Sequence, residues 1–149
     1  MQLGKAAEYA MFATVYIARH EKDGPVQGRD AAEACGIAEE DLLKILQQLV
    51  RSQVLRSERG RSGGFRLRKT PSQTTLLEIL EAMHGPVTGE SAVRSQLKSA
   101  SAVRDHLNRI CDDVAQYTRS VLKKTTVRKL MNFENPRARA RVASLSRPA

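Results

Sequence analysis

The segment most informative about the fold runs from Glu39 to Leu67 and reads EEDLLKILQQLVRSQVLRSERGRSGGFRL. In its first half the apolar residues recur at three- and four-residue steps, which predicts a short amphipathic helix with one broad apolar face. These apolar residues are Leu42, Leu43, Ile45, Leu46, Leu49 and Val50. The second half changes period, because an extended segment begins at Val54 and a later one alternates Phe65 and Leu67 with arginines. The pattern therefore predicts a helix followed by a two-stranded hairpin.

The predicted hairpin is glycine-rich at its tip and strongly basic. The segment GRSGG at residues 60–64 holds three glycines, which can adopt positive φ without strain. Glu58 is the acid in a hairpin whose basic residues are Arg56, Arg59, Arg61, Arg66, Arg68 and Lys69. Such a hairpin directly after a helix is typical of the wing of a winged helix, and a polyanion is its natural partner.

Composition narrows the class of protein. The chain has 149 residues, enough for one domain or for a small domain with an appendage. Aromatic residues make up only 4% of it, so the core must be mainly aliphatic, as is usual in helical proteins. A net charge of +9 indicates a nucleic acid or an anionic membrane as partner, and its clustering on the hairpin favours nucleic acid. No apolar run approaches the roughly 18 residues of a membrane helix, and the first residues are too polar for a signal peptide, so we expect a cytoplasmic protein with no membrane partner.

The residues before the hairpin predict a helix-turn-helix. Residues 5–20 form a helix that is apolar on nearly every side, as expected for a helix buried between other elements. A short alanine-rich helix, residues 29–35, ends at Gly36, where a C-cap glycine belongs. With the helix that begins at Glu39, this makes two helices joined by a tight turn. Behind the hairpin, Thr74 or Thr75 is predicted to cap a helix over residues 76–83, which Gly85 ends.

A long helix is predicted over residues 101–123. Its apolar residues are spaced 4, 3, 4, 3 and 4 apart, which is an a/d heptad seam. Packing on the protein's own core would need a broader stripe, so the seam favours a symmetric dimer over an intrachain partner. The predicted dimer interface consists of Val103, Leu107, Ile110, Val114, Tyr117 and Val121.

The chain thus divides into three predicted parts. Residues 1–86 form a winged helix-turn-helix domain, and residues 87–131 form a loop and a dimerisation helix. Residues 132–149 have little apolar surface to bury and carry four arginines, which predicts a basic, disordered tail. The fold class is therefore mainly α with a small β-hairpin, in which a long C-terminal helix follows the winged domain.

Candidate DNA-binding residues lie on the second helix of the helix-turn-helix, on the wing and on the first helix. Glu39 and Glu40 suit the positive end of the helix dipole, although a carboxylate there can also accept from a cytosine amine in the major groove. Wing arginines suit phosphates and narrow minor grooves. The candidates are Lys5, Tyr9, Glu39, Glu40, Lys44, Gln47, Arg59, Arg61 and Arg66.

Three motifs carry a resemblance to a known family. They are the tripeptide EYA at residues 8–10 with the apolar run behind it, the wing sequence RGxxGGFxL at residues 59–67, and TLLEILEAMxGP at residues 75–86. In this order and spacing the chain resembles the Rrf-two family of bacterial winged-helix transcription regulators, over about residues 1 to 130. The resemblance implies a DNA-binding homodimer whose subunits pair through a long C-terminal helix.

The cysteines depart from the cluster-binding members of that family. Those members carry three cysteines between the Gly-Pro and the long helix, whereas this segment has none; the chain's cysteines are Cys35 and Cys111. An iron–sulfur cluster needs about four ligands, mostly thiolates, so no metal or other cofactor is expected. The chain is thus similar to the clusterless branch, typified by the cysteine-metabolism repressor, and a partner protein or a small ligand would regulate it. Cys111, beside Ile110, is either a redox-sensitive thiol or a small residue in a helix interface.

The function predicted is a sequence-specific transcriptional regulator that binds a pseudo-palindromic operator in double-stranded DNA, acting as a repressor. The alternative is a basic RNA- or ribosome-associated adaptor with the same fold, although RNA readers usually expose aromatic residues for stacking. The sequence shows no nucleophile–base pair, metal-ligand spacing or phosphate loop before a helix, so no enzyme and no catalytic residue is predicted.

Overall fold

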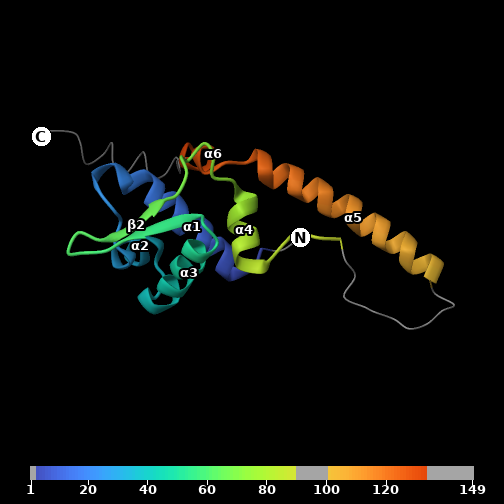
Figure 1. Ribbon diagram of the computed structural model, residues 1–149, viewed down its shortest axis with the longest axis horizontal. Helices are drawn as coiled ribbons and strands as arrows, with labels where there is room; N and C mark the ends of the chain where they lie inside the picture. The colour runs from blue at the N-terminus through green and yellow to red at the C-terminus, as the bar shows by residue number, and fades with distance from the viewer. Residues whose placement is uncertain (1–2, 90–100, 134–149) are drawn as a thin grey trace, which may run out of the picture.

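The computed structural model describes residues 3–89 and 101–133, and Figure 1 shows how their elements are arranged. The predicted loop over residues 90–100 and the predicted tail from residue 134 onward lie outside these described residues. The elements, in chain order, are α1 (Lys5–His20), the short 3-10 helix η1 (Glu21–Asp23), α2 (Gly28–Cys35), α3 (Glu39–Arg51), β1 (Leu55–Glu58), β2 (Gly64–Leu67), α4 (Leu76–His84), α5 (Ser101–Lys124) and α6 (Val127–Met131).

The molecule has two regions of different shape. We call the elements from α1 to α4, together with α6, the head, and α5 the arm. The arm begins far from the head and runs back to it, where α6 follows (Figure 1). Every helix predicted from the sequence is present, and the wing is an antiparallel pair with Leu55 opposite Leu67. The fold is therefore mainly helical with one small hairpin, as predicted.

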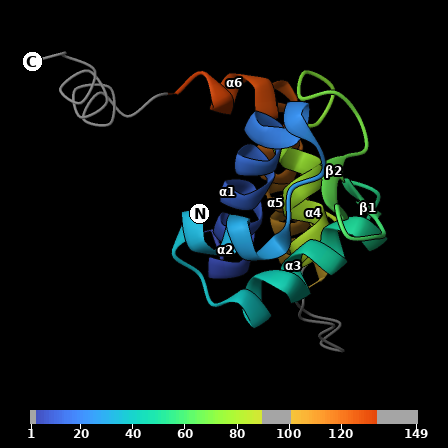
Figure 2. The same cartoon turned by 90° about the vertical axis from the view of Figure 1, so that its left-hand side faces the viewer.

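Helix α1 is the centre of the head. It packs against α2, α3, α4, α6 and β2, which surround it in Figure 2. Ala10, Ala13 and Ile17 are completely buried, so small side chains let the surrounding elements approach closely. The prediction of burial on nearly every side is wrong at Phe12, which is 55% exposed, and at Ala6 in the first turn, which is also exposed. The elements around α1 leave these positions uncovered.

The turn between α2 and α3 depends on Gly36. Its φ of 66° is left-handed, a conformation that suits glycine, and its N–H donates to the carbonyls at the end of α2. The next residue, Ile37, donates its N–H to the carbonyl of Ala32 at 3.0 Å. This closes α2 and sets the direction in which α3 begins.

The hairpin is joined to the helices by a pairing that the sequence did not predict. Val26, in the connection between η1 and α2, forms an isolated antiparallel bridge with Phe65 of β2, with N–H to carbonyl distances of 3.0 and 2.8 Å. Gly64 makes this possible, because a Cβ at that position would lie 2.4 Å from the carbonyl oxygen of Val26. The bridge fixes the wing beside the helix-turn-helix.

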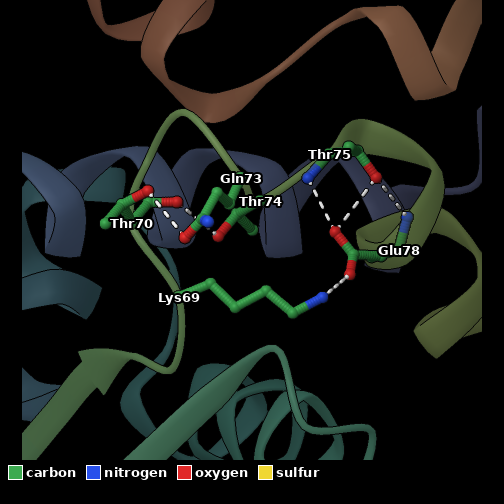
Figure 3. A network of polar contacts seen from close by, with 6 residues as sticks. All are labelled: Lys69, Thr70, Gln73, Thr74, Thr75 and Glu78. Carbon is green, nitrogen blue, oxygen red and sulfur yellow. Dashed lines mark hydrogen bonds and ion pairs between the residues drawn. The ribbon is translucent and has the colours of Figure 1, made fainter.

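Helix α4 begins at a capping box. Of the two threonines predicted as caps, Thr75 has this role: its hydroxyl accepts from the N–H of Glu78, and the Glu78 carboxylate accepts from the N–H of Thr75. Figure 3 shows that Lys69, at the end of the wing, also reaches Glu78, with 2.6 Å between Nζ and Oε1. Thr74 is buried, and its hydroxyl donates to the carbonyl of Thr70.

Backbone hydrogen bonds fasten the arm to the head where α5 ends. Leu76 donates its N–H to the carbonyl of Thr125, and Val127 donates to the carbonyl of Thr74, both at 2.9 Å. The guanidinium of Arg119 on the arm also pairs with Glu81 of α4. These contacts fix where the arm leaves the head and therefore the direction in which it extends.

Candidate nucleic-acid interface

Helix α3 presents a polar stripe to solvent. Its buried face consists of Leu42, Leu46 and Leu49, each with no exposed surface. The opposite stripe has steps of four, three and four residues, so its side chains lie on one face of the helix. It consists of Glu40, Lys44, Gln47 and Arg51, all exposed, with Glu39 exposed at the helix start.

The structure adds two residues of α3 to the predicted candidates. Arg51 continues the stripe one turn beyond Gln47 and is exposed, and the four-residue spacing is a signal that could have identified it. Leu43 belongs to the broad apolar face predicted from the sequence, and the structure leaves it 40% exposed. An exposed leucine beside polar groups can contact a thymine methyl group.

Lys44 is free to reach a phosphate or a base. Its Nζ lies 3.8 Å from the Asp41 carboxylate, and both side chains are largely exposed. An exposed ion pair of this kind contributes little to stability, about 0 to 1 kcal/mol, so the ammonium can exchange partners at little cost. The contact with Asp41 therefore does not keep Lys44 from reaching DNA.

The wing arginines fall into two groups. Arg59 and Arg61, at and beside the turn, are exposed, and Figure 1 shows the hairpin loop projecting from the head. Arg56 is also exposed, with its guanidinium 3.5 Å from Glu58. The tip can therefore present two cations to a polyanion.

Arg66, which the sequence placed with the DNA-binding residues, is engaged inside the protein. Its guanidinium donates to the carbonyl of Glu21, and its Nε lies 3.1 Å from Glu58, close enough for an ion pair although that N–H is not aligned for a hydrogen bond. The Glu21 carboxylate in turn accepts from the N–H of Leu67 at 2.9 Å. Arg66 thus connects the wing to η1. The exposed arginines of the wing are Arg56, Arg59, Arg61 and Arg68.

The two candidates on α1 lie together. The Lys5 ammonium is 5.4 Å from the centre of the Tyr9 ring, a cation–π distance, and Tyr9 is half-buried against the core. The first turn of α1 lies at the same end of the head as α3 in Figures 1 and 2. Both side chains can therefore approach a duplex that α3 enters.

The predicted seam on the arm faces solvent. Its six residues are 46% to 74% exposed. On the face next to the stripe, Ala115 and Leu122 are buried. The arm therefore presents a continuous apolar stripe that is about half exposed or more, with residues 87–89 lying beside Ile110 and Val114.

The chain's cysteines lie far apart in the fold. Cys35 is half-buried on α2, and burial raises the pKa of its thiol above the usual value; Cys111 is exposed on the arm. Within residues 3–89 and 101–133, no three histidine, cysteine or acidic residues form a group that could hold a metal ion. These residues do not fit an iron site. Among the same residues, no helix has the length and apolarity needed to cross a membrane.

A helix-turn-helix with a basic wing and an exposed polar stripe on its second helix defines the class of winged-helix DNA-binding regulators. The comparison with protein families agrees: residues 3–133 match the Rrf2 family model, described as "Iron-dependent Transcriptional regulator". The chain belongs to the Rrf2 family and is a DNA-binding transcriptional regulator. The iron in that description is not matched by the donor groups among residues 3–89 and 101–133.

Curated relatives belong to the same class, and a solved structure shares the fold. The chain is 29% identical over 127 residues to a Mycobacterium tuberculosis protein named as an HTH-type transcriptional regulator, covering 85% of this chain and 79% of that protein. It is 28% identical over 137 residues to the HTH-type transcriptional regulator IscR of Yersinia enterocolitica, covering 91% and 82%. The structure of CymR, the global cysteine regulator of B. subtilis, superposes with a TM-score of 0.71 at 22% identity, covering 91% of this chain and 99% of that one. At that identity the likeness shows the shared fold.

Proposed function

We propose that this regulator is a homodimeric repressor whose two arms pair with each other. The observation that carries the proposal is the apolar stripe of the arm. Six apolar side chains at heptad spacing, all exposed, form a surface that a second helix of the same kind would bury. The charged and polar residues between them would stay exposed to solvent at the edge of such a pair.

A symmetric pair of arms supports binding to a pseudo-palindromic operator. Two-fold symmetry places the two α3 helices in successive major grooves, with half-site centres about 10 bp or a multiple apart. Glu39, Glu40, Lys44 and Gln47 are the proposed base-facing residues, and Arg51 extends their row. Phosphate and sugar contacts would fix the register of each head on the duplex.

The wing and α1 would supply most of the backbone contacts. We assign Arg59 and Arg61 to the minor groove or its phosphates, because both are exposed at the tip. We assign Lys5 and Tyr9 to the backbone beside α3. Arg66 serves DNA binding indirectly in this proposal, since it holds the wing in place through Glu21 and Glu58.

Occupying a promoter in this way excludes RNA polymerase, so repression is the proposed outcome, and the protein would act in the cytoplasm beside the chromosome. It carries out no catalysis in this proposal. With no iron site that fits the described residues, regulation would come from a partner protein or a small ligand that changes the relative placement of the two heads.

The test is to place charge in the stripe. Leu107→Asp combined with Ile110→Asp should give a monomer, because each unpaired buried charge costs about 3–5 kcal/mol at an interface. Sedimentation measures the mass, and a fluorescence titration measures affinity for the operator, which should fall at least tenfold when only one head binds at a time. Gln116→Asp, exposed on the arm but outside the stripe, is the matched control. A double variant that remains a dimer of normal affinity would place the interface elsewhere.

A further inference from the structure

A groove on the open side of α1 is separate from the DNA-facing surface and from the stripe of the arm. It has a volume of about 560 Å³ and lies between α1, the C-terminal end of α2, the start of α4 and α6. Phe12 and Tyr16 of α1 form one wall, and Leu130 and Phe133 form another. This volume falls within the range of about 300 to 1,000 Å³ that is typical of small-molecule sites.

The groove is apolar apart from one cation. Among the described residues that line it, Arg19 alone is charged. One N–H of its guanidinium donates to the carbonyl of Met131 at 2.7 Å, which fixes the side chain at the rim beside α6. A guanidinium has five N–H donors, so it can still bind a carboxylate. An apolar wall with one positioned cation is complementary to an acid with an apolar body.

The Cys35 side chain adds to the apolar wall rather than to the charge. It lines the groove at the end of α2, and burial raises the pKa of its thiol, which keeps it neutral near pH 7. A neutral thiol packs as a small apolar group. Arg19 therefore has no anionic neighbour among the lining residues to compete with a ligand carboxylate.

We propose that this groove binds a small organic carboxylate with an apolar chain or ring, held by Arg19 at the rim and by Phe12, Tyr16 and Phe133 along the walls. A second copy of the chain is the competing occupant. The stripe of the arm, however, has a self-complementary partner in its own copy, whereas the groove is a concave site with its cation at a fixed place.

The position of the groove gives the ligand a route to the DNA-binding surface. Cys35 and Ala34 directly precede the Gly36 turn that sets the direction of α3, and Leu130 and Phe133 follow the arm. A bound acid therefore contacts both the helix-turn-helix and the segment that joins the arm to the head. The acid would therefore act as an effector that changes operator affinity. This part of the inference rests on the proposed function as a dimeric regulator.

Binding can be tested without DNA. Calorimetric titration of the full chain with octanoate should show one site per chain, and Arg19→Gln should weaken octanoate at least tenfold while leaving the uncharged octanamide unchanged. Ala34→Trp should abolish binding of both, because exposed Ala34 lines the groove and a large ring would fill it. Glu33→Trp, exposed on the same helix but not lining the groove, is the matched control. Thermal unfolding of each variant shows that the fold is kept.

Several results would overturn the site. One is a calorimetric titration that shows no heat with octanoate or with 3-phenylpropanoate. Another is an octanoate affinity that is unchanged in Ala34→Trp. A third is a dimer that dissociates in Ala34→Trp, because the groove would then be an interface between copies. A separate operator titration with saturating octanoate tests the coupling. Operator affinity that changes in the wild type and not in Ala34→Trp supports it, and octanoate binding that leaves operator affinity unchanged would overturn the coupling. No operator binding in any sample, with or without octanoate, would instead count against the proposed binding of a dimer to the operator.

Discussion

Helix α3 in the head and the arm have apolar residues at similar spacing, but these residues are buried in α3 and exposed on the arm. Both are amphipathic helices with aliphatic residues at three- and four-residue steps. In α3 the leucines at 42, 46 and 49 have no exposed surface, whereas Leu107 of the arm is 53% exposed. The comparison shows that periodicity defines a face of a helix but not what covers it. In the head, other elements of the same chain bury the apolar face of α3, and on the arm a second copy of the chain would bury the stripe.

Truncating one leucine in each region tests this difference in burial with the largest expected effect. Leu46→Ala should lower the free energy of unfolding by about 2–5 kcal/mol at any protein concentration, because it leaves a cavity in a core that is already packed. Leu107→Ala should cost much less in a dissociated chain, and its cost should appear only at concentrations at which the dimer forms. Urea unfolding at two concentrations separates the two cases. Equal, concentration-independent losses would mean that Leu107 is buried within its own chain.

Two arginines of the wing allow a similar test within the head, because one is exposed and the other is half-buried. Arg59→Ala should weaken binding to every DNA sequence and reduce the salt slope by about one unit, without changing stability. Arg66→Ala should lower stability by about 1–3 kcal/mol, since it leaves Glu58 and the Glu21 carbonyl without a half-buried partner. Salt-dependent titrations with urea unfolding measure both, and Arg128→Ala, exposed on α6, is the control. If Arg66→Ala reduced the salt dependence of DNA binding and Arg59→Ala lowered stability, the roles given to the two arginines would be wrong.

The smallest expected effect concerns the junction between the wing and α4. Burial alone raises the pKa of Glu78, but hydrogen bonds from Lys69 and from the N–H and hydroxyl of Thr75, with the Lys69 charge, outweigh it, so the pKa is lowered. A carboxyl with a lowered folded pKa stabilises the fold above its unfolded value, about 4.3, and this contribution is lost as pH falls through the folded value.

Glu78→Gln should therefore be less stable than the wild type at pH 7, and the difference should shrink below about pH 4. The difference should stay under about 1 kcal/mol, because the side chain is about one third exposed. Thermal unfolding from pH 7 to pH 3 measures it, with Glu33→Gln, exposed on α2, as the control. A difference that grows toward low pH would contradict the sign of the shift.

Much of the fold could be predicted because its determinants are short-range. The boundaries of α1 and α3, the glycine at the end of α2 and the threonine before α4 follow from patterns within one or two helical turns. The candidate site was only partly predictable. The stripe of α3 follows from spacing, but Arg66 could not be separated from Arg59, since its partner Glu21 lies 45 residues away in the sequence.

The order of the helices, the basic wing, the heptad stripe and the family could be read from the sequence, because each depends on local periodicity, local charge or a short motif. Which apolar residues are covered and which arginines face solvent depends on the folded chain. In the structure, Val26 lies beside β2, Phe12 is exposed and Arg19 is next to the end of α6. These outcomes depend on contacts between residues far apart in the chain, whose geometry is set only when α1 is surrounded by its neighbours.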